Sequence, residues 1–144
     1  MLAIYKASAG SGKTFTLAYE YIKMLLGVKN PNTGRYLLNR GQRDRHRHIL
    51  AVTFTKKATG EMKERIIHEL AVLGNLEYKW PDPSPYAKRL CDELHCTPDE
   101  LTKAAATALR QLLFDFNFFQ VNTIDSFFQG ILRTFAHEVD VSGN

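Results

Sequence analysis

The chain has 144 residues, of which 44% are hydrophobic and 24% are charged, and its formal net charge is +4. This composition is typical of a globular domain with a hydrophobic core and excludes an intrinsically disordered chain. The mildly basic balance permits an anionic partner such as nucleic acid but does not require one.

Two further features of the sequence exclude whole classes of protein. No apolar run approaches the ~20 residues that span a bilayer, and the opening residues lack the pattern of a signal peptide. We therefore expect a cytoplasmic protein without membrane contact. Cys91 and Cys96 are the two cysteines, and their spacing predicts neither a disulfide framework nor a zinc site.

The first half of the chain predicts two strand–helix pairs. Residues 2–5 and 48–55 are short, mostly apolar and β-prone, so both are expected to be buried strands. Helical spacing follows each of them, over residues 13–26 and then up to about residue 73. The apolar positions recur every three or four residues: Phe15, Ala18, Ile22, Leu25, Ala58, Met62, Ile66 and Leu70. Gly27 is expected to end the first helix, and residues 28–47 are expected to form a loop.

The second half predicts two more helices, a third strand and a last helix. Ser84 is expected to cap a helix that extends to about residue 94, with Pro85 in its first turn. Thr97 and Glu100 have the spacing of a capping box at the start of the next helix. Residues 118–124 are expected to be a strand, and Ser126 with Gln129 has the pattern of a second capping box.

This order of elements predicts an α/β fold with a parallel sheet. Strands that alternate with helices are joined by right-handed crossovers, and ligands bind at the carboxyl ends of such strands. Three segments are expected at this edge: residues 7–14, 53–57 and 123–126. The candidate functional residues come from these three segments.

The first segment belongs to "KASAGSGKTF", residues 6–15, a small-residue turn between a strand and a helix. Small side chains let backbone N–H groups enclose a phosphate, and this pattern is the phosphate-binding loop, or Walker A motif, with Ala7 in place of its first glycine. Lys13 is predicted to reach the terminal phosphates of ATP, and Thr14 to bind Mg²⁺. The predicted nucleotide-binding residues are Ala9, Gly10, Ser11, Gly12, Lys13, Thr14 and Phe15. The alternative is a turn of small residues without a ligand.

The second segment, residues 51–66, has the sequence "AVTFTKKATGEMKERI". Thr53 and Thr55 place hydroxyls near a helix start, where they suit a phosphate, and Phe54 suits stacking on a base. Lys56 and Lys57 add positive charge. The alternative is a capped helix with a buried Phe54 and a solvated basic face.

The third segment, residues 121–135, has the sequence "VNTIDSFFQGILRTF". Thr123 and Ser126 again place hydroxyls near a helix start. Asp125 could cap the helix, hold a water molecule or bind Mg²⁺, and the alternative is a cap followed by a core helix.

Together, the three segments resemble the motifs of superfamily 1 DNA helicases of the UvrD/Rep group, in family order over residues 2–137. The first is similar to the RecB/AddA exonuclease–helicase branch, the second to TFTNKAAxEM, and the third to TxHS/G. The resemblance implies a three-layer, RecA-like P-loop core that binds ATP and Mg²⁺ through Lys13 and Thr14. It also implies that a set of side chains lines a path for single-stranded DNA: Thr53, Phe54, Thr55, Lys56, Lys57, Thr123 and Ser126. Lys56 replaces the family's Asn, and Asp125 replaces its His.

The resemblance further implies a division of the chain. Residues 1–73 and 118–144 would form the N-terminal part of a motor domain, and residues 74–117 a helical insert. The Asp-Glu motif that the family needs is not found, and "LLFD" at residues 112–115 is expected to be a chance match at a helix end. We therefore expect one part of a longer helicase, with partner subunits of a helicase–nuclease complex. Two alternatives remain open: a small P-loop nucleotide kinase and a non-catalytic binding module.

Overall fold

A three-stranded parallel sheet lies at the centre of the candidate site. The computed structural model describes residues 2–4, 11–76 and 84–142 of the chain. The sheet has the strand order β1-β4-β5, and its strands are β1 (Leu2–Ile4), β4 (Leu50–Thr53) and β5 (Gln120–Thr123). Both neighbouring pairs are parallel. The predicted α/β class with a parallel sheet is therefore confirmed.

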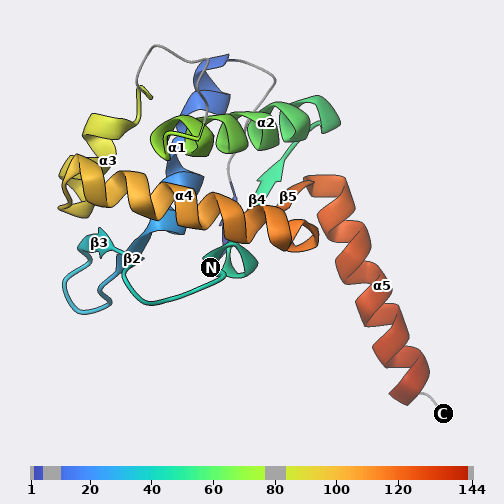
Figure 1. Ribbon diagram of the computed structural model, residues 1–144. Helices are drawn as coiled ribbons and strands as arrows, with labels where there is room; N and C mark the ends of the chain where they lie inside the picture. Colours follow the sequence, from blue (N-terminus) through green and yellow to red (C-terminus); the bar gives the residue numbers. More distant parts are fainter. Residues whose placement is uncertain (1, 5–10, 77–83, 143–144) are drawn as a thin grey trace.

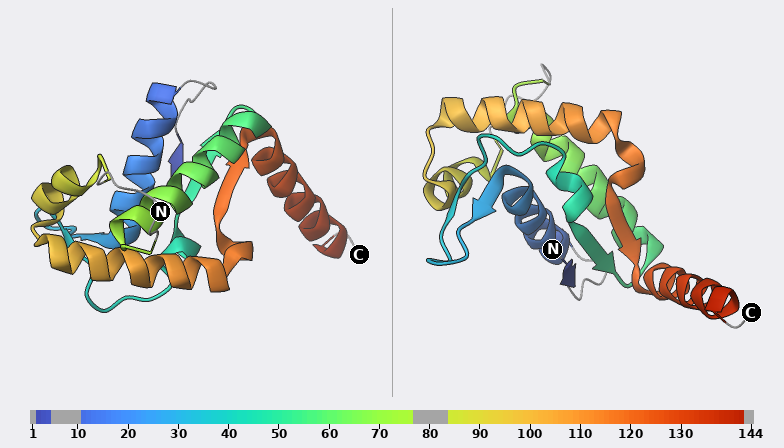
Figure 2. Two further views of the ribbon diagram at one scale, coloured as in Figure 1. Left: turned by 45° about the horizontal axis from the view of Figure 1, so that its top comes forward. Right: turned by 90° about the horizontal axis from the view of Figure 1, so that it is seen from below.

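The ranges given above contain five α-helices (Figure 1). Their bounds are α1 (Ser11–Leu26), α2 (Lys56–Leu73), α3 (Ala87–Leu94), α4 (Pro98–Phe114) and α5 (Ile124–Ser142). Helix α1 packs against α2, and α4 packs across both of them. Helix α2 lies next to β4 and β5, and α4 lies on top of α1 and α2 (Figure 2).

The core is made by the helix faces that the apolar spacing predicts. Ala58, Met62, Ile66 and Leu70 lie on one side of α2 and are each at most 1% exposed. Apolar residues of α3 and α4 belong to the same cluster: Leu90, Leu94, Leu101, Ala105, Leu109 and Leu112. Residues 84–112 therefore pack into one shared core with α1 and α2. The interpretation of residues 74–117 as a family insert stays a prediction.

The region expected to be a loop contains a short hairpin, so that expectation is wrong for part of it. Strands β2 (Gly27–Lys29) and β3 (Tyr36–Leu38) pair in antiparallel fashion, and a 3₁₀ helix (Arg45–His48) follows. The strands are only three residues long, which is too short for alternation to reveal them. Gly27 ends α1 as predicted, and its surroundings favour glycine: a Cβ there would lie 2.8 Å from the main-chain oxygen of Lys23 and 2.5 Å from Leu94 Cδ2 of α3.

The helix starts confirm one predicted cap and correct two. Thr97 and Glu100 form the predicted capping box of α4. The N-cap of α3 is Tyr86 and not Ser84, so the helix begins later than predicted. The Ser84 hydroxyl accepts the Tyr86 backbone N–H at 3.2 Å just before the helix and donates a hydrogen bond to the buried carboxylate of Glu69. Ser126 does not open α5, which already begins at Ile124. The Thr123 hydroxyl accepts the Ser126 backbone N–H at 3.2 Å and so serves this helix start.

Helix α5 extends away from the sheet, and its main contacts within the described residues are with β4 and β5 (Figure 1). Several of its large apolar side chains are exposed: Phe128, Ile131, Leu132, Phe135 and Val139. Among the described helices, none has the length and apolar character needed to cross a membrane.

Glu93 joins α3 to α1 through a cluster of charged and polar groups. Its carboxylate accepts a hydrogen bond from the Tyr19 hydroxyl at 2.7 Å and from Arg89 Nε at 2.6 Å, and it forms an ion pair with Lys23. Partial burial would raise the pKa of Glu93, but the hydrogen bonds from Lys23, Tyr19 and Arg89 outweigh it and lower the pKa to about 2. The ionised carboxylate thus stabilises the folded chain.

We expect Glu93→Gln to lower the free energy of unfolding at neutral pH by about 2 kcal/mol, because three donors lose a charged acceptor. The folded-state pKa of Glu93 lies below the ordinary value of 4.5, so this stabilisation is complete above that pH and is lost as pH falls towards about 2. Urea denaturation at a series of pH values measures the difference between the two proteins. Asp92→Asn, at an exposed neighbouring carboxylate of α3, is the matched control. A difference that stays constant between neutral pH and about pH 3 would contradict the assignment.

Candidate functional site

The first turn of α1 carries the described part of the phosphate-binding motif. The predicted residues Ala9 and Gly10 lie outside the described ranges, and the helix begins at Ser11. Gly12 and Lys13 are exposed, whereas Thr14 is only 5% exposed. A Cβ at Gly12 would meet no heavy atom of the described residues within 4 Å, so among them the space next to this turn is open. Exposed N–H groups at a helix start suit an anion, and the helix dipole favours negative charge there.

The side chain that follows holds this turn against the core. Phe15 is half-buried, and its ring lies 4.7 Å from the ring of Tyr86, measured between centroids. The Tyr86 hydroxyl donates a hydrogen bond to the main-chain carbonyl of Phe15. Arg65 of α2 lies 5.9 Å from the centroid of the Phe15 ring. In this structure Phe15 therefore positions the start of α1 by packing.

The end of β4 is fixed by a network of threonine hydroxyls. Thr53 is 1% exposed, and its hydroxyl lies 2.6 Å from the hydroxyl of Thr59. The Thr53 hydroxyl also donates to the main-chain carbonyl of Thr55 at 3.2 Å. The Thr53 hydroxyl is therefore buried and hydrogen-bonded within the protein. Its predicted role as a DNA ligand stays a prediction.

The residues after Thr53 form an exposed basic turn. Phe54 is 48% exposed, so the alternative of a buried ring is wrong. Thr55 is the N-cap of α2, and its hydroxyl accepts the backbone N–H of Ala58 at 3.0 Å. Lys56 and Lys57 occupy the first turn, which contains no acidic residue, and both are exposed. Lysines at a helix N-terminus add to the positive end of its dipole, so this turn concentrates positive potential.

The end of β5 lies next to the end of β4. Thr53 and Thr123 are register partners in the parallel pair, which places the second and third predicted segments side by side. The Thr123 hydroxyl donates a hydrogen bond to the Ser126 hydroxyl at 3.0 Å. Ser126 and Asp125 are exposed, and Asp125 adds one negative charge to the first turn of α5.

We call the carboxyl rim the set of residues 11–15, 53–57 and 123–126. It combines an exposed glycine turn, an exposed aromatic ring and threonine or serine residues at three helix starts. Figure 2 shows the starts of the helices that follow the strands. Such a surface can bind phosphate groups by backbone and hydroxyl donors and can support a base by stacking. The structure brings the second and third segments together by strand pairing, as the sequence predicts.

Sequence reasoning missed Thr59, whose hydroxyl completes the network beneath the carboxyl rim. It donates to the main-chain carbonyl of Thr55 at 3.2 Å in addition to its contact with Thr53. The signal in the sequence is its position four residues after the N-cap, where a threonine hydroxyl reaches a carbonyl of the preceding turn. Its partner Thr53 comes from the strand, which spacing along the helix does not reveal.

Asp115 is structural, as expected of the chance match at residues 112–115. It is the C-cap of α4, and both of its oxygens accept hydrogen bonds from the Arg47 guanidinium. These hydrogen bonds, together with that from the His46 ring, hold the pKa of Asp115 below its usual range. Within the described ranges Asp44, His46 and Asp115 offer ligand atoms within 4.8 Å of one another. The guanidinium already neutralises the carboxylate, so this group does not favour a cation.

Comparison with known proteins agrees with this geometry. The chain matches the UvrD/REP helicase N-terminal domain over residues 3–144. It is 28% identical over 138 residues to an ATP-dependent helicase/nuclease subunit from Lactobacillus gasseri, covering 96% of this chain and 8% of that protein. It is 36% identical over 94 residues to the RecB subunit of the RecBCD enzyme from Escherichia coli, covering 63% of this chain and 7% of that protein. No solved structure gives a significant match.

The chain therefore spans less than a tenth of the length of these two relatives. The match to the domain family, in contrast, covers nearly the whole chain, and it includes all three segments of the carboxyl rim. This confirms the resemblance that the motifs indicate. The chain belongs to the UvrD/REP helicase N-terminal domain family.

Proposed function

We propose that this chain is the N-terminal, ATP-binding part of an ATP-dependent DNA helicase that moves along single-stranded DNA in recombination or repair. The single observation that supports it most is the pairing of Thr53 with Thr123, which brings two of the family's motif segments to one edge of the sheet. The same family membership argues against a small nucleotide kinase. In the full-length protein the observed sheet would be part of a three-layer, RecA-like P-loop core.

The first turn of α1 would hold the phosphates of ATP. Support comes from the exposed residues Gly12 and Lys13 at a helix N-terminus and from the space that the described residues leave open at Gly12. The Lys13 ammonium would contact the terminal phosphates, and the Thr14 hydroxyl would bind Mg²⁺, with Ala9, Gly10 and Ser11 completing the loop. A bound ATP–Mg²⁺ supplies the phosphoryl group whose hydrolysis drives movement of the motor. The residues of this chain bind and orient it.

We expect Lys13→Ala in the full-length protein to lower DNA-stimulated ATP hydrolysis at least about a hundredfold, because the terminal phosphates lose their cation. Binding of single-stranded DNA should stay within about twofold and keep its salt dependence, since other residues of the carboxyl rim hold the DNA. A phosphate-release assay and fluorescence anisotropy measure the two properties. Lys88→Ala, at an exposed lysine of α3, is the matched control. Unchanged turnover in Lys13→Ala would remove this residue from the site.

Single-stranded DNA would bind across the two helix starts that follow β4 and β5. The exposed Phe54 ring offers a stacking surface for a base, and Lys56 and Lys57 offer cations for phosphates. The hydroxyls of Thr55 and Ser126 lie at the same edge and suit backbone contacts. In this arrangement the hydrogen bonds of Thr53 and Thr123 hold the turns after β4 and β5 in position along the DNA path. A direct contact of either hydroxyl with DNA is also proposed.

We expect Phe54→Ala to weaken binding of oligothymidylate by about 1–3 kcal/mol, the usual contribution of one stacked base. The matched control is Phe114→Ala, which removes a 93% exposed ring at the end of α4, away from the carboxyl rim. Fluorescence anisotropy at fixed salt compares the three proteins. Equal affinity of Phe54→Ala and the unchanged protein, or an equal loss in Phe114→Ala, would contradict the stacking role.

The relatives also bear on partners. One of them is named as a helicase/nuclease subunit, and the other as the RecB subunit of the RecBCD enzyme. We propose that the full protein likewise belongs to a helicase–nuclease complex. Copurification of a nuclease activity with the full-length protein, lost on separation of the subunits, tests this part.

A further inference from the structure

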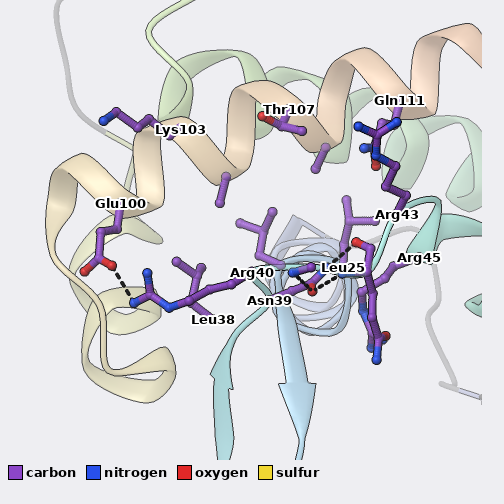
Figure 3. Close-up of a pocket in the computed structure, with 15 residues that line it drawn as sticks. Leu25, Leu38, Asn39, Arg40, Arg43, Arg45, Glu100, Lys103, Thr107 and Gln111 are labelled. Carbon is purple, nitrogen blue, oxygen red and sulfur yellow. Dashed lines mark hydrogen bonds and ion pairs between the residues drawn. The ribbon is translucent and has the colours of Figure 1, made fainter.

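A cavity of about 510 Å³ lies between the segment that follows β3 and one face of α4 (Figure 3). It is separate from the carboxyl rim, because it lies at the other end of α1. Leu25 belongs to its lining, whereas Lys13 lies in the first turn of the same helix, and twelve helical residues span about 18 Å. Its volume is in the range of sites that bind small molecules or a few side chains of a partner.

The floor of the cavity is aliphatic. Leu25 and Leu38 come from α1 and β3, and Ala104 and Ala108 come from adjacent turns of α4. Alanines four residues apart lie on one face of a helix, and their small side chains leave the space open. A floor of this kind favours an aliphatic or other apolar group of a ligand.

The walls of the cavity carry an excess of positive charge. Arg40, Arg43, Arg45 and Lys103 line it together with one carboxylate, Glu100. Glu100 is in an ion pair with Arg40, and Arg45 Nε donates to the Met24 carbonyl at 3.1 Å. Within the described part of the chain, the side chains of Arg43 and Lys103 have neither an ion pair nor a hydrogen bond. Two exposed cations beside an apolar floor favour a ligand with negative groups next to an apolar one.

The loop that forms one wall is held in place before any ligand binds. The Asn39 side chain accepts the backbone N–H of Gln42 at 2.9 Å and donates to the Gln42 carbonyl at 2.7 Å. Further along, the Asp44 backbone N–H donates to Gln111 Oε1 of α4 at 3.2 Å. The wall is therefore ordered by its own hydrogen bonds and tied to α4, which lowers the entropy lost when a ligand binds.

We propose that this cavity binds an acidic peptide segment of another protein. An aliphatic side chain of the segment lies on the alanine-lined floor, and its carboxylates pair with Arg43 and Lys103. The aliphatic floor favours a peptide over nucleic acid, because the lining residues in the described part of the chain include no aromatic ring on which a base could stack. Figure 3 shows Lys103 and Glu100 on α4 on one side of the cavity and the loop residues on the other.

The test uses the full-length protein and a phage-displayed library of random octapeptides as the probe. We expect the enriched peptides to combine Asp or Glu with Leu, Ile or Val. A fluorescein-labelled copy of the most enriched peptide is then measured by anisotropy. The double variant Arg43→Glu/Lys103→Glu should weaken its binding about tenfold or more, because attraction becomes repulsion. Thr107→Trp, at an exposed lining position, should weaken binding similarly by filling the cavity at unchanged charge.

The matched control is Lys29→Glu/Lys88→Glu, which makes the same change in net charge at two exposed lysines outside the cavity. This control should leave peptide affinity within about twofold. The Arg43/Lys103 variant should retain its ATP hydrolysis, so that a loss of peptide binding is distinguished from a loss of the proposed motor function. Three outcomes would overturn the proposal: no enrichment, enriched peptides without an acidic bias, or equal binding by the double variant and its control. Loss of oligothymidylate affinity in the double variant, with peptide binding unchanged, would assign the cavity to nucleic acid instead.

Discussion

The parallel pairing of β4 with β5 is the constraint on which the candidate site depends. Thr53 and Thr123 end these strands as register partners, so the two helix starts that follow are necessarily neighbours. A shift by one residue would turn every side chain of the strand to the opposite face. The Thr53 hydroxyl would then leave Thr59, and this side-chain contact between α2 and the strand would be lost. The exposed aromatic ring and the lysines after β4 owe their position to this register.

Much of this arrangement could be predicted from the sequence, and the exceptions have physical causes. The apolar spacing of α2 and the capping box of α4 are local signals, and both are confirmed. The hairpin of β2 and β3 is not predicted, because its strands are short and are identified by their pairing with each other, not by their own composition. The residue type of Ser84 predicts a helix cap, but the helix begins after Tyr86, and the Ser84 hydroxyl joins the chain before it to the buried carboxylate of Glu69. Tertiary contacts decide each of these cases.

The candidate site, too, has features that the sequence predicts and features that depend on tertiary contacts. The rule that ligands bind where parallel strands end is sufficient to group residues 53–57 with 123–126. It cannot predict that the Thr53 hydroxyl is buried, because that depends on Thr59 from the following helix. The apolar residues of the region between the two segments complete the core against α1 and α2, a contact that no local pattern reveals. The helices that build the cavity beside α4 therefore also support the sheet.

The contact between Tyr86 and Phe15 has a consequence for how position 15 can vary. The Tyr86 hydroxyl bonds to the main-chain carbonyl of Phe15, a group that every amino acid possesses. Replacement of the ring by another apolar side chain would alter packing but would leave this tether to the first turn of α1 intact. The hydrogen bond from Tyr86 is thus independent of the side chain at position 15. Substitutions at this position would change the packing but not the hydrogen bond.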